Sequence, residues 1–181
     1  MKERKILSFD IGIHHFAFVL MQVFDETRWN IIHMECHDFH KNEKLYNIVM
    51  NQDFWNNFHH YIVTNDKYIQ KADIILIEKQ LGFGKQINYK ANQISSQLYA
   101  HLILFYPDKE IIEYPSSFKT KFFDFKSTNK KDRKNWSVQK VYSLLEERND
   151  ETSLEWLNTF PKKDDICDCV LMNLSFMKQY F

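Results

Sequence analysis

Residues 71–80, KADIILIEKQ, contain the short apolar run that decides the fold class. Four consecutive aliphatic residues between charged neighbours are typical of a strand buried on both faces, usually a central parallel strand of an α/β sheet. The run ends at Glu78. Because a carboxylate that emerges from a buried strand needs a partner or a metal ion, this stretch predicts a candidate site as well as a strand.

Helical patterns lie on both sides of this strand. In residues 42–63, apolar side chains recur at spacings of three, four and seven, which predicts an amphipathic helix. Residues 81–90 hold two of the three glycines and are predicted to form a loop. A second helix is predicted over residues 88–106, because Pro107 follows and cannot continue it.

The remaining elements complete an alternating α/β pattern. Short apolar runs predict three strands before the first helix, over residues 5–9, 14–24 and 28–36, and one strand after the second helix, over residues 110–114. Two further helices are predicted at the end, over residues 137–148 and 164–178. The first three strands have short turns between them, which favours an antiparallel meander. The order β-β-β-α-β-α-β-α-α predicts one α/β domain over residues 1–181, with a five-stranded mixed sheet flanked by helices.

The composition excludes several classes of protein. It is 44% hydrophobic and 16% aromatic with three Gly and three Pro, which argues against a disordered chain. No apolar run approaches the roughly 20 residues of a membrane span, and the N-terminus lacks a signal-peptide core, so we expect a soluble protein without a membrane partner. Three cysteines make no even disulfide framework, and we interpret Cys167 and Cys169 as buried apolar residues.

Carboxylates stand at the ends of three predicted elements. Asp10 follows the first strand and Glu78 the fourth, and sites in open α/β sheets form at the carboxyl ends of strands. Asp165 and Asp168 share one face of the last helix through their i, i+3 spacing, with Asp164 as the alternative if the register differs by one residue.

Each of these acids has an ordinary structural explanation when it is taken alone. Asp10 fits a turn before Gly12, Glu78 fits a lysine partner, and acids in a first helical turn complement the helix dipole. Taken together, four converging carboxylates repel one another, and hard divalent cations relieve that repulsion. Two such ions about 4 Å apart suit the hydrolysis of a phosphodiester bond.

The motifs SFDIG, ILIEKQ and DDICDCVL resemble those of the RuvC-type Holliday junction resolvases of the RNase H-like superfamily, nearest to the branch of poxviruses and other large DNA viruses. The resemblance implies an RNase H-like fold and symmetric cleavage of four-way DNA junctions with two Mg²⁺ or Mn²⁺ ions. It carries the catalytic and metal-binding role onto four acids: Asp10, Glu78, Asp165 and Asp168. For the viral branch it implies a virus factory in the host cytoplasm; for the related mitochondrial resolvases it implies an organelle, and otherwise an intracellular location that stays unknown.

The resemblance also implies a catalytic basic residue and a homodimer. The basic residue follows the fifth strand, where Lys119 is the first candidate and Lys121 and Lys134 are alternatives. The dimer interface of the family lies at the position of the helix predicted over residues 88–106, whose apolar residues include Ile94, Leu98 and Phe105. An intramolecular core explains the same residues equally well.

A basic segment is the second candidate for DNA contact. Residues 117–140 carry eight basic and two acidic residues, whereas residues 146–168 carry eight acids and three basic residues. Because phosphate contacts dominate DNA affinity, we predict DNA contacts from Lys121, Lys130, Lys131, Arg133 and Lys134, and from Phe83 and Lys85 in the loop after Glu78. The aromatic residues among these lysines belong either to the core or to a base-stacking surface.

Three other functions remain for comparison. An RNase H-type nuclease acting on RNA–DNA hybrids would use the same acids, and a non-catalytic nucleic-acid-binding domain would keep the fold but not all four acids. An actin-like ATPase needs two such domains and glycine-rich phosphate loops, which three glycines in 181 residues do not supply.

Overall fold

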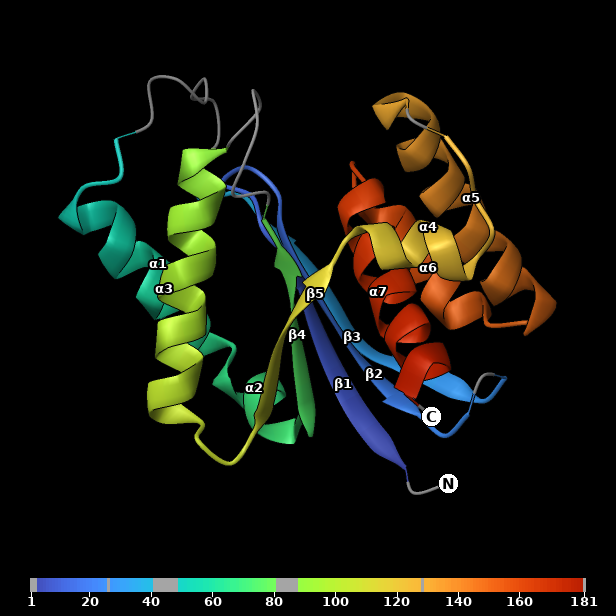
Figure 1. Ribbon diagram of the computed structural model, residues 1–181, viewed down its shortest axis with the longest axis horizontal. Helices are drawn as coiled ribbons and strands as arrows, with labels where there is room; N and C mark the ends of the chain where they lie inside the picture. Colours follow the sequence, from blue (N-terminus) through green and yellow to red (C-terminus); the bar gives the residue numbers. More distant parts are fainter. Residues whose placement is uncertain (1–2, 26, 41–48, 81–87, 128, 181) are drawn as a thin grey trace.

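The computed structural model describes residues 3–25, 27–40, 49–80, 88–127 and 129–180. Its five strands form one sheet in the order β3-β2-β1-β4-β5 (Figure 1). The strands are β1 (Arg4–Asp10), β2 (Phe16–Val23), β3 (Trp29–His37), β4 (Ile74–Lys79) and β5 (Glu110–Pro115). β1, β4 and β5 are parallel, whereas β2 is antiparallel to both β1 and β3. The predicted meander, mixed sheet and interior position of β4 are therefore confirmed.

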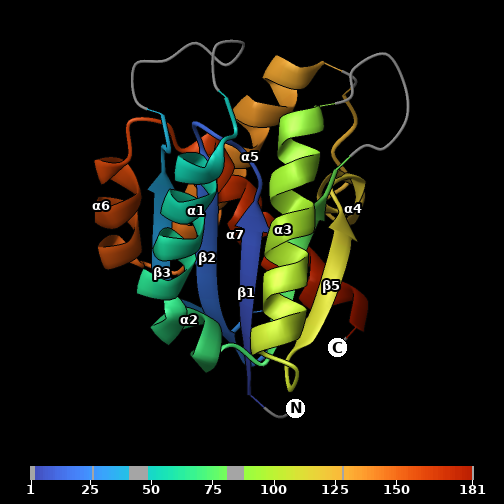
Figure 2. The same ribbon diagram turned by 90° about the vertical axis from the view of Figure 1, so that its left-hand side faces the viewer.

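Two layers of helices cover the sheet. The helices are α1 (Gln52–Thr64), α2 (Asp66–Lys71), α3 (Tyr89–Phe105), α4 (Ser117–Phe122), α5 (Lys130–Glu147), α6 (Glu151–Thr159) and α7 (Asp164–Tyr180). Helices α1, α2 and α3 lie on one face, and α4 to α7 lie on the other (Figures 1 and 2). Of these helices, α7 lies against the sheet and is buried along most of its length. No helix in the described ranges is long and apolar enough to cross a membrane.

Helix boundaries differ from the predictions where polar side chains cap a helix. The helix predicted from residue 42 begins, within the described residues, at Gln52, because the Asn51 side chain accepts a hydrogen bond from the Phe54 amide. Residues 41–48 lie outside the described part of the chain. Conversely, α5 begins seven residues before the predicted position of 137, because Asn129 caps it. The prediction missed this start because the first two turns are rich in lysine and show no apolar period.

Three helices were not predicted: α2, α4 and α6. They have six, six and nine residues, which is too short for an apolar period to stand out. Helix α6 has a readable start, since the Asp150 side chain accepts from the Ser153 amide at 3.0 Å. Within the described residues, the element order therefore contains three helices more than the predicted β-β-β-α-β-α-β-α-α.

The two-residue repeat of the strands decides which side chains reach α7. Leu7 and Phe9 of β1 belong to the core beneath α1 to α3, whereas Ile6 belongs to the core beneath α7. Asp10 lies four residues, or two full repeats, after Ile6 and therefore faces the same α7 side of the sheet. The parallel pairing of β1 with β4 matches Phe9 with Ile77, so its continuation places Asp10 level with Glu78.

Polar contacts set the position of α7 on the sheet. The Ser8 hydroxyl of β1 donates to the Cys169 carbonyl at 3.0 Å, and the buried Asn173 amide donates to the Val19 carbonyl at 3.1 Å. Cys167 and Cys169 are free and fully buried, as interpreted from the sequence. Because α7 cannot slide along the strands without breaking these bonds, its acids are held at the carboxyl end of β1.

Candidate active site

The site begins where β1 and β4 end. The chain leaves β1 at Asp10 and turns back into β2, and Gly12 makes this turn possible because a Cβ there would lie 2.9 Å from the His15 carbonyl oxygen. Asp10 and Glu78 follow paired positions of two parallel strands, and the charge of Glu78 contributes to the raised pKa of Asp10.

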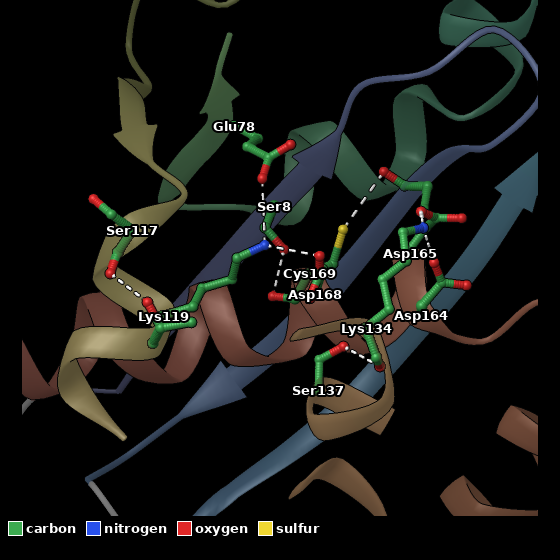
Figure 3. Close-up of polar contacts among 12 residues, drawn as sticks. Ser8, Glu78, Ser117, Lys119, Lys134, Ser137, Asp164, Asp165, Asp168 and Cys169 are labelled. Atoms are coloured by element: carbon green, nitrogen blue, oxygen red, sulfur yellow. Dashed lines mark hydrogen bonds and ion pairs between the residues drawn. The ribbon is translucent and has the colours of Figure 1, made fainter. Parts of the chain in front are cut away.

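Lys119 of α4 brings a positive charge to this pair. Its side chain is only 6% exposed, and its Nζ lies 3.3 Å from Glu78 Oε1 and 3.0 Å from Asp168 Oδ2 (Figure 3). Asp168 comes from the second turn of α7. We call Asp10, Glu78, Asp168 and Lys119 the buried cluster. It joins β1, β4, α4 and α7, and its first and last residues, Asp10 and Asp168, are 158 positions apart in the sequence.

The electrostatics of the buried cluster show a shortage of positive charge. The pKa of Asp10 is raised well above its ordinary value, first by burial and then by the charge of Glu78. Burial also raises the pKa of Asp168, although Lys119 opposes this. Burial works against the charge of Glu78 as well, but Lys119 lowers the pKa of that carboxyl overall. One ammonium therefore stabilises fewer carboxylates than the cluster contains.

A second group of charges lies at the start of α7. Lys134 of α5 contacts Asp164 closely and lies 3.7 Å from Asp165 Oδ1 (Figure 3). Lys162 contacts Asp165 closely and lies 3.5 Å from Asp164 Oδ2. We call these four residues the rim cluster. Its aspartate side chains are 12% exposed, but Lys134 and Lys162 are 35% and 34% exposed. This cluster therefore borders solvent on its cationic side.

The structure thus divides the predicted acids between two clusters. Asp10, Glu78 and Asp168 surround Lys119, whereas Asp165 lies with Asp164 one turn away on α7. Among the described residues, no three His, Cys, Asp or Glu side chains are arranged to hold a metal ion as they stand. Lysine ammonium groups contact these carboxylates in the places where cations would be expected.

The donor set nevertheless fits hard divalent cations. Five carboxylates within two adjoining clusters offer only oxygen ligands, which Mg²⁺ and Mn²⁺ prefer. The raised pKa of Asp10, which burial and Glu78 cause, shows a carboxyl group whose charge lacks a sufficient partner. A divalent ion would supply that partner.

The predicted DNA-binding residues occupy different environments. Lys121, Lys130, Lys131 and Arg133 are exposed, while Lys134 is half-buried in the rim cluster. Phe83 and Lys85 lie outside the described residues. The aromatic residues of the basic segment pack mainly inward: Phe118, Phe123 and Trp136 contact the core beneath α7, and Phe125 stacks on Trp136 at 4.6 Å. These side chains support the core explanation.

Sequence reasoning missed two contributors. Lys162 was not among the sequence candidates, although it stands three residues before Asp165, its ion-pair partner. Ser8 carried no sequence signal, because a small polar residue in a strand does not reveal its partner.

Comparisons with known proteins place this geometry in a family. The family described as "Poxvirus A22 protein" matches residues 4–179. A protein of Invertebrate iridescent virus 3, described as uncharacterized protein 97L, is 34% identical over 119 residues, which are 64% of this chain and 54% of that protein. The chain therefore spans about half the length of this viral relative.

Solved structures agree on the fold. The yeast mitochondrial Holliday junction resolvase superposes with a TM-score of 0.67 and 20% identity over 98% of this chain and 81% of its own. RuvC of Thermus thermophilus in complex with a Holliday junction substrate superposes with a TM-score of 0.61 and 14% identity. The match covers 94% of this chain and 91% of that chain. The expected RNase H-like fold of the RuvC type is confirmed, and the match along nearly the whole chain shows that this protein belongs to the poxvirus A22 protein family.

Proposed function

We propose that this chain is a Holliday junction resolvase, a divalent-metal-dependent endonuclease that cleaves four-way DNA junctions symmetrically. The observation that carries the proposal is the buried cluster, in which three carboxylates and Lys119 meet at the carboxyl ends of β1 and β4. Membership of the A22 family and a fold shared with two Holliday junction resolvases support this substrate. Residues 1–181 act as one nuclease domain.

The chain's own residues prepare the reaction. Asp10, Glu78, Asp165 and Asp168 hold two Mg²⁺ or Mn²⁺ ions, with Asp164 as the alternative to Asp165. The chemistry that such ions supply is activation of the attacking water and stabilisation of the leaving oxygen. Lys119 stays protonated, because the carboxylates of Asp168 and Glu78 raise its pKa although burial opposes this. Its ammonium therefore stabilises negative charge on the scissile phosphate.

Phosphate contacts outside the centre hold the DNA arms. The exposed residues Lys121, Lys130, Lys131 and Arg133 face solvent, where they are free to approach the DNA backbone. Lys134 joins them from the rim cluster, and Phe83 and Lys85 are proposed as contacts from the loop after β4. The expected consequence is an affinity that falls steeply as the salt concentration rises.

Symmetric cleavage requires two active sites, so we propose that the chain acts as a homodimer. Four large apolar side chains of α3 are exposed, namely Tyr89, Ile103, Leu104 and Phe105. Ile94 and Leu98 are instead fully buried in the intramolecular core. Because the family and the iridescent-virus relative are viral, we place the activity in a virus factory in the host cytoplasm.

The test of this function is cleavage of a synthetic four-way junction. Purified protein is incubated with the junction, with a linear duplex of the same sequence and with an RNA–DNA hybrid, in Mg²⁺ and in EDTA. We expect paired symmetric cuts in the junction only, and only with metal. Asp165→Asn should abolish them, whereas Asp53→Asn, which changes an aspartate in the first turn of α1, should not.

Three results would argue against the proposal. Equal cleavage of the linear duplex would exclude a junction-selective enzyme. Preferential cleavage of the hybrid would indicate an RNase H-type nuclease. Metal-independent junction binding without any cleavage would indicate a non-catalytic nucleic-acid-binding domain.

A further inference from the structure

An open hollow of 760 Å³ adjoins the rim cluster. Its wall consists of the first turns of α5 and the segment that leads into α7, with the residues Asn129, Lys130, Lys131, Lys134, Asn135, Val138, Pro161, Lys162, Lys163 and Asp164. Five of these residues are lysines and one is acidic. Both helices point their N-termini toward this region, which adds the positive ends of two helix dipoles. The chemistry of the hollow therefore favours an anion.

Two of the five lysines line the hollow and also contact the aspartates of the rim cluster. Lys134 and Lys162 line the hollow, and each also contacts both Asp164 and Asp165. About one third of each lysine side chain is exposed, so each ammonium can turn from the aspartates toward the hollow without crossing the protein interior. Lys131 lines the same hollow, but within the described part of the chain its ammonium forms no ion pair with either aspartate.

We propose that the hollow binds a phosphate group of the DNA backbone and that Lys134 and Lys162 couple this binding to metal binding at Asp164 and Asp165. This inference rests on the proposed function. Without DNA, the two ammonium groups occupy the aspartates and compete with a divalent cation. A phosphate in the hollow attracts the same two ammonium groups and leaves the aspartates available to metal.

The competition follows from charge. An ammonium group that contacts a carboxylate must leave before a divalent cation takes its place, and both cannot share the same oxygen without strong repulsion. By linkage, if DNA raises the affinity for metal, metal raises the affinity for DNA by the same factor. Couplings of this type usually lie between about 5-fold and 150-fold.

Lys119 is the internal contrast to this arrangement. It also contacts two carboxylates, those of Glu78 and Asp168, but its side chain is only 6% exposed and lines no part of the hollow. Its ammonium therefore cannot move from its carboxylates to a phosphate bound in the hollow. The coupling is assigned to the rim cluster because its two lysines contact the carboxylates and also line the hollow.

The test separates metal binding from catalysis. Mn²⁺ binding to the DNA-free protein is measured by isothermal titration calorimetry for wild type and the variants Lys134→Gln, Lys162→Gln, Lys131→Gln and Lys71→Gln. We expect Lys134→Gln and Lys162→Gln to bind Mn²⁺ at least about 5-fold more tightly than wild type. Lys131→Gln, which removes a charge from the same hollow, and Lys71→Gln, at the end of α2, should match wild type.

The reciprocal effect is measured with DNA. Fluorescence anisotropy of a labelled 12-base-pair linear duplex, titrated in Mn²⁺ and in EDTA at equal ionic strength, should show tighter binding with Mn²⁺ for wild type. In the double variant Lys134→Gln/Lys162→Gln this gain should disappear. In Lys131→Gln the overall affinity should fall while the gain from Mn²⁺ remains.

Two outcomes would overturn the inference: Mn²⁺ affinities of Lys134→Gln and Lys162→Gln that equal that of Lys131→Gln, or a wild-type DNA affinity that does not respond to Mn²⁺. Neither measurement depends on cleavage. If the junction is cleaved but the coupling is absent, the proposed function stands and this inference fails. If the coupling is present and no DNA substrate is cleaved, the proposed function fails and the inference stands for a DNA-binding protein.

Discussion

The buried cluster and the rim cluster use the same chemistry in different surroundings. In each, lysine ammonium groups contact carboxylates of α7, but Lys119 is 6% exposed while Lys134 and Lys162 are about one third exposed. A buried ion pair is strongly held, because an unpaired charge has no water to replace its partner. A partly exposed pair exchanges readily with solvent and ions. We therefore expect Lys119 to keep its carboxylate partners, whereas Lys134 and Lys162 exchange the rim aspartates for other ligands.

The largest expected effect separates the two clusters by activity. Asp168→Asn removes a proposed metal ligand from the buried cluster and should lower the rate of junction cleavage roughly 1,000-fold, a loss as large as that from removing a positioned catalytic group. Asp164→Asn in the rim cluster should lower it about 10-fold, as for a residue that supports a metal ligand. Single-turnover kinetics with a labelled junction measure both. A loss in Asp164→Asn much larger than about 10-fold would indicate that Asp164, and not Asp165, is the metal ligand.

The next effect concerns stability. Lys119→Met leaves Glu78 and Asp168 buried without their cation, so the free energy of unfolding in EDTA should fall by about 3–5 kcal/mol. Lys134→Met should lower it by less than about 1 kcal/mol, since Asp164 and Asp165 keep their contacts with the second cation, Lys162. Urea unfolding followed by circular dichroism measures both. Added Mn²⁺ should restore much of the stability of Lys119→Met; equal losses in the two variants would remove the distinction between the clusters.

A smaller effect is the opposite pH response of the two clusters in metal-free protein. Burial raises the pKa of Asp10 above its ordinary 3.8, so its contribution to stability is complete below that value and is lost as the pH rises through the folded-state pKa. Burial opposes the charge of Asp164, but its bond with Lys134 lowers that pKa. Its contribution is therefore present above the ordinary pKa and is lost as the pH falls through the lowered one.

Carboxyl-carbon nuclear magnetic resonance checks these directions residue by residue. The resonance of Asp10 should titrate above pH 3.8 and that of Asp164 below it. Addition of a divalent metal should shift the Asp10 titration downward. Titration of both groups in the same direction would contradict the assigned difference in their surroundings.

The smallest expected effect tests how α7 is held. Ser8→Ala removes the bond to the Cys169 carbonyl and should cost about 1 kcal/mol of unfolding free energy. Because Ser8 lies two residues before Asp10, and Cys169 directly follows Asp168, the metal concentration needed for half-maximal cleavage should also rise. Ser175→Ala, which removes a bond within α7 itself, is the control. A change in stability without a change in metal dependence would limit Ser8 to a structural role.

Much of the fold followed from local patterns. The apolar run before Glu78, the meander before it and the periodic helices after it were predictable because apolar periodicity repeats over many residues. Helices α2, α4 and α6 were not predictable, because their stability comes from packing rather than from their own sequence. The start of α5 was missed because its first turns are lysine-rich, and only the cap at Asn129 marks it.

The sequence by itself determined which carboxylates stand at element ends, because strand and helix boundaries follow from neighbouring residues. Asp10, Glu78 and the acids of α7 were identified in this way. The tertiary structure decided the partner of each carboxylate. Lys119 was the first of several candidate lysines, but its burial against Glu78 and Asp168 depends on how α4 packs against α7. A long flexible side chain carries no sequence signal for its direction, and its direction separates a lysine inside the site from one facing solvent.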